Sequence, residues 1–114
     1  MPSEQLGPLG DILHQIELAG QFVEGFDRET FKREIRSVYA VTRCLEIISE
    51  ASRRLPSELK ARHPAIPWQQ MAAAGNVYRH DYEDVAAHFV WDTVEHALPV
   101  LKAALEQETM RRED

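Results

Sequence analysis

Apolar residues recur at helical spacing along the first part of the chain. Every third or fourth residue belongs to one apolar stripe, made up of Leu9, Ile12, Ile16, Ala19 and Val23. Pro8 suits the first turn of a helix, and Gly25 suits a position just after one. The pattern predicts an amphipathic helix over residues 8–24, with residues 1–7 as a loose end. His14 lies off the stripe, so we expect it at the surface.

A second and longer stripe fills the middle of the chain. A short helix anchored by Phe31 precedes it, because Asp27 followed by Thr30 is typical of a helix N-cap. The long helix ends at Pro56. Its predicted core-facing positions are Ile35, Val38, Val41, Leu45, Ile48, Ser52 and Leu55. Cys44 lies between these apolar positions, and we expect a buried thiol there.

Three prolines between residues 56 and 67 leave room for one short connecting helix at residues 57–62. Pro67 then starts a helix of strong helix formers, which runs into the segment Gly75-Asn76-Val77-Tyr78-Arg79-His80-Asp81-Tyr82. A glycine inside a helix costs about 1 kcal/mol relative to alanine. At Gly75, therefore, either the helix bends or another group packs against it.

A last helix is predicted after the acidic pair Glu83-Asp84. Its apolar positions are Phe89, Val90, Trp91, Val94, Leu98, Leu101 and Leu105. Pro99 is expected to kink this helix without ending it, since apolar spacing resumes directly afterwards. The charged residues 107–114 are expected to fray.

These elements predict one all-α domain over residues 1–114, an antiparallel bundle of four to five helices. The composition agrees, because a chain of 114 residues with 44% hydrophobic and 28% charged residues is typical of a globular domain with one core. Two long amphipathic helices in so small a domain, with Trp68 and Trp91 needing cover, also favour a homodimer.

The cysteine count and the lengths of the apolar runs argue against disulfide-bonded, metal-binding, secreted and membrane-spanning proteins. One cysteine excludes an intramolecular disulfide and a cysteine-based metal cluster, and the histidines and aspartates lack a firm ligand spacing, so no metal and no cofactor are expected. No apolar run approaches 18 residues, and the N-terminus lacks the pattern of a signal peptide. We therefore expect a cytoplasmic protein with no membrane partner.

The charge is distributed unevenly. The net charge of −6 argues against a protein that coats nucleic acid by neutralising phosphates. However, residues 51–82 carry five basic and two acidic side chains, whereas the rest of the chain carries eight and seventeen. This basic island either attracts a polyanion to one place or is simply a solvated charged surface.

The segment at residues 75–82 concentrates the polar chemistry. In a helix, Asn76 and His80 stand one turn apart, and Arg79 and Tyr82 share an adjoining stripe. An imidazole with a reference pKa near 6.5 transfers protons at neutral pH, and a guanidinium holds phosphate bidentately. The patch could hold an anion and move a proton. Alternatively, His80 satisfies a buried hydrogen bond and Arg79 pairs with a neighbouring acid.

Several blocks occur in a recognisable order. They are Asp11-Ile12-Leu13, Leu45-Glu46-Ile47-Ile48-Ser49-Glu50-Ala51-Ser52-Arg53-Arg54-Leu55-Pro56, Ile66-Pro67-Trp68, Asn76 with His80-Asp81-Tyr82, and Val90-Trp91-Asp92-Thr93-Val94. Together they resemble the HepT-like branch of the HEPN superfamily, the toxins of prokaryotic HEPN/MNT toxin–antitoxin pairs. The signature of that family is an Arg, often followed by Asn, and then a His and a Tyr. Here Asn76, His80 and Tyr82 are in register, but Gly75 stands in place of the Arg.

The resemblance implies a type VII-like toxin that is a metal-independent endoribonuclease with a site shared by two subunits. His80 would be the base or acid, with the partner's His80 in the opposite role. Asn76 would orient the phosphate or the imidazole, and Arg79 could lean back toward the position of the missing Arg. Arg53, Arg54 and Arg79 would bind RNA phosphates.

The same resemblance implies a protein partner and leaves alternatives. An MNT-type nucleotidyltransferase antitoxin would add AMP to Tyr82, which places negative charge where phosphate should bind. Tyr82 is otherwise a partly buried ring with its hydroxyl on the backbone. Because of Gly75, the chain is alternatively a catalytically weak or inactive module that binds nucleotide, RNA or the nucleotidyltransferase. A purely structural helical adaptor is the third hypothesis.

Overall fold

The chain is helical throughout most of the ranges that the computed structural model describes, which are residues 7–80 and 84–113, with the side chains of residues 75–80, 84–86, 112 and 113 outside that description. The helices in order are α2 (Pro8–Val23), α3 (Arg28–Arg33), α4 (Ile35–Arg53), α5 (Ser57–Ala61), α6 (Trp68–His80), α7 (Asp84–Asp92), the π-helix η1 (Thr93–Ala97) and α8 (Leu98–Glu113). No strand occurs within these ranges. The predicted all-α class is confirmed.

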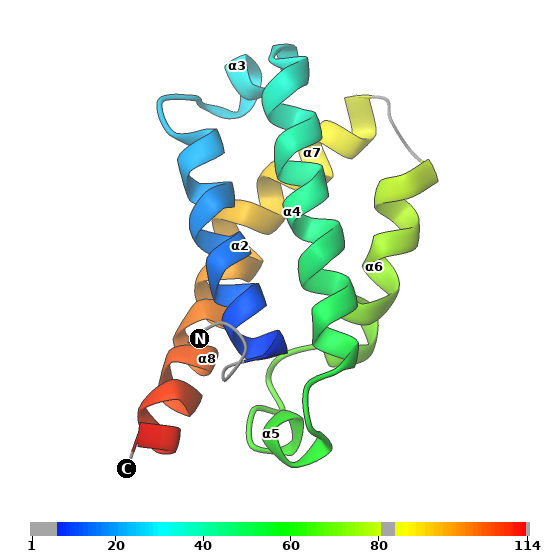
Figure 1. The fold of residues 1–114 in the computed structure, drawn as a ribbon. Coiled ribbons are helices and arrows are strands. Elements are labelled where there is room, and N and C mark those ends of the chain that lie inside the picture. Colours follow the sequence, from blue (N-terminus) through cyan, green and yellow to red (C-terminus); the bar gives the residue numbers. More distant parts are fainter. Residues whose placement is uncertain (1–6, 81–83, 114) are drawn as a thin grey trace.

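Helix α4 lies at the centre of the bundle. It packs against α2 on one side and α6 on the other, and both neighbours run antiparallel to it (Figure 1). The continuous segment α7–η1–α8 crosses behind them and contacts α2, α3 and α4. The apolar stripes of these helices meet in one buried core that includes Ile12, Val41, Leu45, Val90 and Leu101. The expected antiparallel bundle is therefore present in a single chain.

The predicted short helix after Asp27 forms with a capping box. The Asp27 carboxylate accepts a hydrogen bond from the Thr30 backbone N–H at 2.8 Å, and the Thr30 hydroxyl accepts one from the Asp27 N–H at 2.9 Å. The bond from the Thr30 N–H, together with one that the Thr30 hydroxyl donates to the same carboxylate, lowers the pKa of Asp27. The cap places Phe31 in the core, where its ring centroid lies 5.4 Å from that of Trp91.

Two predicted core positions are wrong. Ile35 is 66% exposed. It is the first residue of α4 and lies beyond the end of the core, which the regular spacing of apolar residues does not indicate. Phe89 is 44% exposed, because the buried face of α7–η1 follows Ala87, Val90, Trp91 and Val94 instead. The expectations for two polar positions hold. His14 is exposed, and Cys44 is buried in a way that raises the pKa of its thiol.

The end of the chain differs from expectation in two respects. The irregularity lies in η1, ahead of Pro99, and Pro99 itself is the second residue of α8. A proline cannot donate to the carbonyl four residues earlier and its ring crowds that carbonyl, so a wider π turn before it relieves the conflict. The segment expected to fray from Gln107 continues as helix to Glu113, with Glu108 buried. Residues 1–6 and Asp114 lie outside the described residues.

Candidate active site

The first six residues of the polar segment, residues 75–80, lie on the last turns of α6. Gly75 does not interrupt the helix, whose backbone continues to His80. Positions 76 and 80 are therefore one turn apart on one face, as predicted. The side chains of Asn76, Arg79 and His80, and with them the expected reach of Arg79 toward position 75, lie outside the described residues. Tyr82 lies outside them altogether.

The first turn of α6 is fixed by Trp68. Its indole N–H lies 3.1 Å from the carbonyl oxygen of Lys60 and 3.0 Å from that of His63, so it donates to the end of α5 and the turn after it. The half-buried ring also packs against the core. An indole that is partly buried generally needs such an acceptor, and here that need ties the start of α6 to the connector.

Farther along α6, two side chains of α4 converge on one backbone carbonyl. The Ser49 hydroxyl donates to the Ala72 oxygen at 2.9 Å, and Arg53 donates to the same oxygen through Nε at 3.2 Å and Nη2 at 2.7 Å. Ala72 precedes Gly75 by one turn of α6, and what packs against Gly75 itself lies outside the described residues. These bonds hold α4 against α6 just ahead of the candidate residues.

The neighbouring arginines point elsewhere. Arg54 lies 3.6 Å from Glu50 and 3.7 Å from Asp11, so it faces α2. Arg62 makes a bidentate pair with Glu108 of α8, at 2.7 and 3.1 Å. The predicted phosphate-binding pair is thus divided, because Arg53 faces α6 whereas Arg54 faces α2. Two of the five basic side chains of the island, Arg54 and Arg62, are therefore paired with acids of the same chain.

A buried ionic cluster at Glu108 was not predicted from the sequence. Its carboxylate belongs to a residue that is 4% exposed and accepts hydrogen bonds from Arg62, while His63 Nε2 lies 2.7 Å from Oε2. The hydrogen bonds from Arg62 lower the pKa of Glu108 to about 2, against the opposing effect of burial, and also raise the pKa of Arg62. The signal was present, because Glu108 continues the spacing of Leu101, Ala104 and Leu105 along the buried face of α8.

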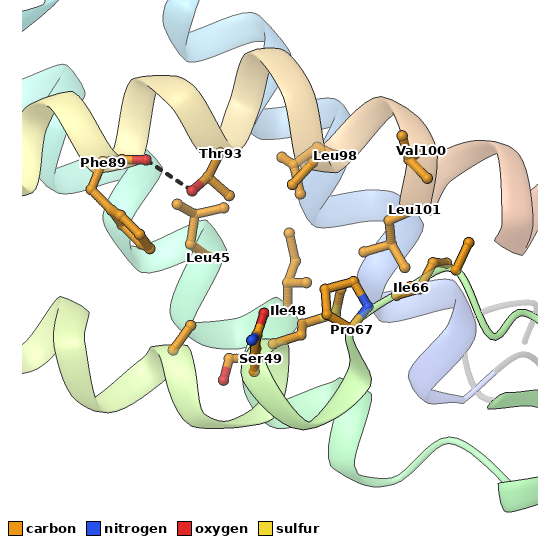
Figure 2. Close-up of a pocket in the computed structure, with 15 residues that line it drawn as sticks. Leu45, Ile48, Ser49, Ile66, Pro67, Phe89, Thr93, Leu98, Val100 and Leu101 are labelled. Carbon is orange, nitrogen blue, oxygen red and sulfur yellow. Dashed lines mark hydrogen bonds between the residues drawn. The ribbon is translucent and has the colours of Figure 1, made fainter.

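An apolar cavity of about 360 Å³ lies between α4, α6 and the segment α7–η1–α8. Figure 2 shows Leu45 and Ile48 on one side of it and Phe89, Thr93 and Leu98 on another. The Thr93 hydroxyl donates to the Phe89 carbonyl at 2.8 Å, which satisfies that polar group. Because the lining is mainly aliphatic, the cavity suits an apolar group and not a phosphate.

Two features of the described residues bear on other classes of function. They contain no group of three or more His, Cys, Asp or Glu side chains able to hold a metal ion. None of their helices combines the length and apolar character needed to cross a membrane.

Comparison with known proteins gives consistent matches over most of the chain. The family described as Ribonuclease HepT-like matches residues 12–108, which extend from α2 to α8 and include Asn76, His80 and Tyr82. A protein of Thermococcus cleftensis named "Probable ribonuclease HepT" is 38% identical over 99 residues, covering 87% of this chain and 90% of its own. A provisionally named RNase of Methanocaldococcus jannaschii is 32% identical, covering 87% and 85%. No solved structure matches.

Proposed function

The chain belongs to the Ribonuclease HepT-like family, and from this we propose that it is an endoribonuclease whose catalytic residues lie on the last turns of α6. The observation that carries the proposal is the unbroken backbone of α6, which puts positions 76 and 80 on one face within the family match. An amide and an imidazole one turn apart can address a single phosphate. No metal is needed for this chemistry.

The proposed reaction uses the 2′-hydroxyl of the RNA. A base removes its proton, the 2′-oxygen forms a bond to phosphorus, and the bond from phosphorus to the 5′-oxygen breaks as an acid protonates that oxygen. His80 takes one of these proton roles, and His80 of a second subunit takes the other. Asn76 orients the phosphate or the imidazole, and Arg79 stabilises the charge that develops on phosphorus. A homodimer with a shared site supplies both histidines.

The proposal extends to regulation. In the cytoplasm the RNase acts as the toxin of a toxin–antitoxin pair, and a nucleotidyltransferase partner neutralises it by adding AMP to Tyr82. The family match supports this only through the register of Tyr82 with the motif. Intact-mass analysis after incubation with such an enzyme and ATP decides the point, because modification that persists unchanged in Tyr82→Phe would exclude this acceptor.

Replacing His80 tests the catalytic proposal. We expect His80→Ala to lower the rate of RNA cleavage at least about 100-fold, the usual contribution of a positioned acid or base. His14→Ala is the matched control, because His14 is an exposed helical histidine on α2. It should cleave as the wild type does. Helical circular dichroism and the melting temperature establish that both variants fold. Cleavage by His80→Ala at the wild-type rate would overturn the proposal.

A second candidate function rests on Gly75. Because the motif arginine is missing, the chain alternatively binds RNA or nucleotide without cleaving it. In that case purified protein would leave RNA intact while its melting temperature rises with added nucleotide. Cleavage that depends on His80 would exclude this alternative.

A further inference from the structure

Arg53 carries a fixed cation from α4 to the flank of α6. Its Nε and Nη2 lie 3.2 and 2.7 Å from the carbonyl oxygen of Ala72, and the Ser49 hydroxyl lies 2.9 Å from the same oxygen. A guanidinium held by two donors to one acceptor has little freedom to turn. The charge of Arg53 is therefore positioned before any ligand arrives.

Hydrogen bonds elsewhere in the protein show which α6 positions border this carbonyl. Ser52 donates to the carbonyl three residues earlier at 2.7 Å, and Thr42 to the carbonyl four residues earlier at 2.6 Å. By the same geometry, positions 75 and 76 border the Ala72 carbonyl. Position 75 is glycine and has no side chain, whereas position 76 is the candidate residue Asn76. Arg53 thus lies next to the polar face of α6.

The charge of Arg53 is also available. The residue is exposed, and no carboxylate pairs with it within residues 7–74 and 87–111. Its contacts with Ala72 use Nε and Nη2, which leaves the Nη1 end for a ligand. Arg54 and Arg62, in contrast, are paired with acids. A guanidinium held in this way is well suited to a phosphate oxygen.

We propose that Arg53 binds a second RNA phosphate on the same strand as the scissile one and so sets the register of the strand along α6. The helix rises about 12 Å over the eight residues from Ala72 to His80, which is more than one phosphate group spans. Arg53, which is held at Ala72, and His80 therefore address different phosphates. This inference rests on the proposed function and adds a binding residue from a second helix to it.

The test compares Arg53→Gln with Arg54→Gln in binding a single-stranded 2′-deoxy oligonucleotide, which cannot be cleaved by attack of a 2′-hydroxyl. Glutamine keeps an N–H donor for the Ala72 carbonyl but removes the charge, so the contact between α4 and α6 is retained. Fluorescence anisotropy over a range of salt concentrations gives both the affinity and its salt dependence. We expect Arg53→Gln to bind about tenfold more weakly and to lower the slope of log K against log salt by about 0.7. Arg54→Gln should stay within about twofold of the wild type, because Arg54 already pairs with acids on α2 and α4.

Arg53→Lys provides a second variant that retains the positive charge. We expect it to keep the wild-type slope of log K against log salt even if its contact with the Ala72 carbonyl is weaker. Unchanged affinity and slope in Arg53→Gln, or equal losses in both glutamine variants, would overturn the inference while leaving RNA cleavage by the wild type intact. A wild-type protein that neither binds nor cleaves would overturn the proposed function as well. The two failures are therefore distinguishable.

Discussion

Glu108 is a carboxylate buried on α8 that joins the helix to the segment after α5. It receives two hydrogen bonds from Arg62, and His63 Nε2 lies 2.7 Å from one of its oxygens. Removing a charge from water is costly unless hydrogen bonds replace the lost hydration, and here the Arg62 bonds outweigh that cost, since the pKa of Glu108 falls to about 2. The ionised form belongs to the folded state.

This lowered pKa predicts how stability changes in acid. The pKa of Glu108 falls from the ordinary glutamate value of 4.5, which applies to the unfolded chain, to about 2 in the folded protein. Its stabilising contribution is therefore complete above the unfolded value and is lost as pH falls toward the folded one. We expect Glu108→Gln to lower the free energy of unfolding by about 2 kcal/mol at neutral pH. Its stability should also depend less on pH over that window. Urea unfolding at a series of pH values measures both effects.

The control is Glu106→Gln, since Glu106 is an exposed residue on the same helix. It should remain within about 0.5 kcal/mol of the wild type. If Glu108→Gln and wild type lost stability in parallel between pH 4.5 and about 2, the hydrogen bonds of Arg62 would not be the cause of the pH dependence.

At the scale of elements, two glycines near the end of α2 allow two effects to be tested separately. Substitution of one tests helix propensity, and substitution of the other tests the cost of a positive φ. A Cβ added at either Gly20 or Gly25 would meet no atom within 4 Å. Gly20 lies inside α2, whereas Gly25 follows the helix with φ of +86°. We expect Gly20→Ala to raise the free energy of unfolding by up to about 1 kcal/mol. Gly25→Ala should lower it by about 1 kcal/mol, because alanine is strained at positive φ.

Thermal and urea unfolding of the two variants give the comparison directly. Since the space around both sites is open, steric overlap contributes to neither result. Opposite signs confirm that conformation is the cause. A destabilised Gly20→Ala would show that some other property of α2 controls its stability.

Helix spacing predicted most of the elements, because each stripe depends on neighbours along one helix. Among the predicted stripe positions, Leu9, Ile12, Val41 and Ile48 are buried as expected. The predicted burial of Ile35 and Phe89 was wrong, because burial depends on where other helices lie and end. A local sequence pattern does not contain that information. The helix continues past Pro99 as predicted, but the π turn before it was not predicted, since spacing alone did not show how the helix would accommodate the proline.

For the candidate site, too, the sequence predicted relations within one helix but not contacts between helices. The one-turn relation of positions 76 and 80 followed from the sequence and is present in α6. The distinction between Arg53 and Arg54 did not follow, although both stand in the matched block. Adjacent residues on a helix point about 100° apart, and only packing determines which one meets α6 and which one meets α2. Contacts between helices carry that information.

At the scale of the molecule, the expected homodimer has different support from that first considered. Trp91 is buried in its own chain and Trp68 donates its N–H to two carbonyls there, so neither tryptophan requires a second subunit. Large exposed apolar side chains remain elsewhere, including Ile35, Tyr39, Val100 and Met110. The proposed chemistry adds a requirement, because one motif histidine cannot be acid and base at the same time.

A shared site predicts that activity depends on protein concentration. We expect the specific rate of RNA cleavage to fall on dilution in parallel with the dimer fraction measured by analytical ultracentrifugation. His80→Ala mixed in excess with wild type should also lower the rate, since mixed dimers lack one histidine. A specific rate that stays constant where the protein is entirely monomeric would contradict the shared site.

The placement of the two tryptophans gives the protein two internal optical probes. Trp91 is excluded from water beside Phe31, so its emission should be shifted to the blue and should report on the contact of α3 with α7. Trp68 is partly exposed at the junction of α5 and α6, and its emission should lie farther to the red. With Trp91→Phe or Trp68→Phe, the remaining fluorescence would follow one end of the bundle at a time. Loosening of α6 could then be observed separately from melting of the core.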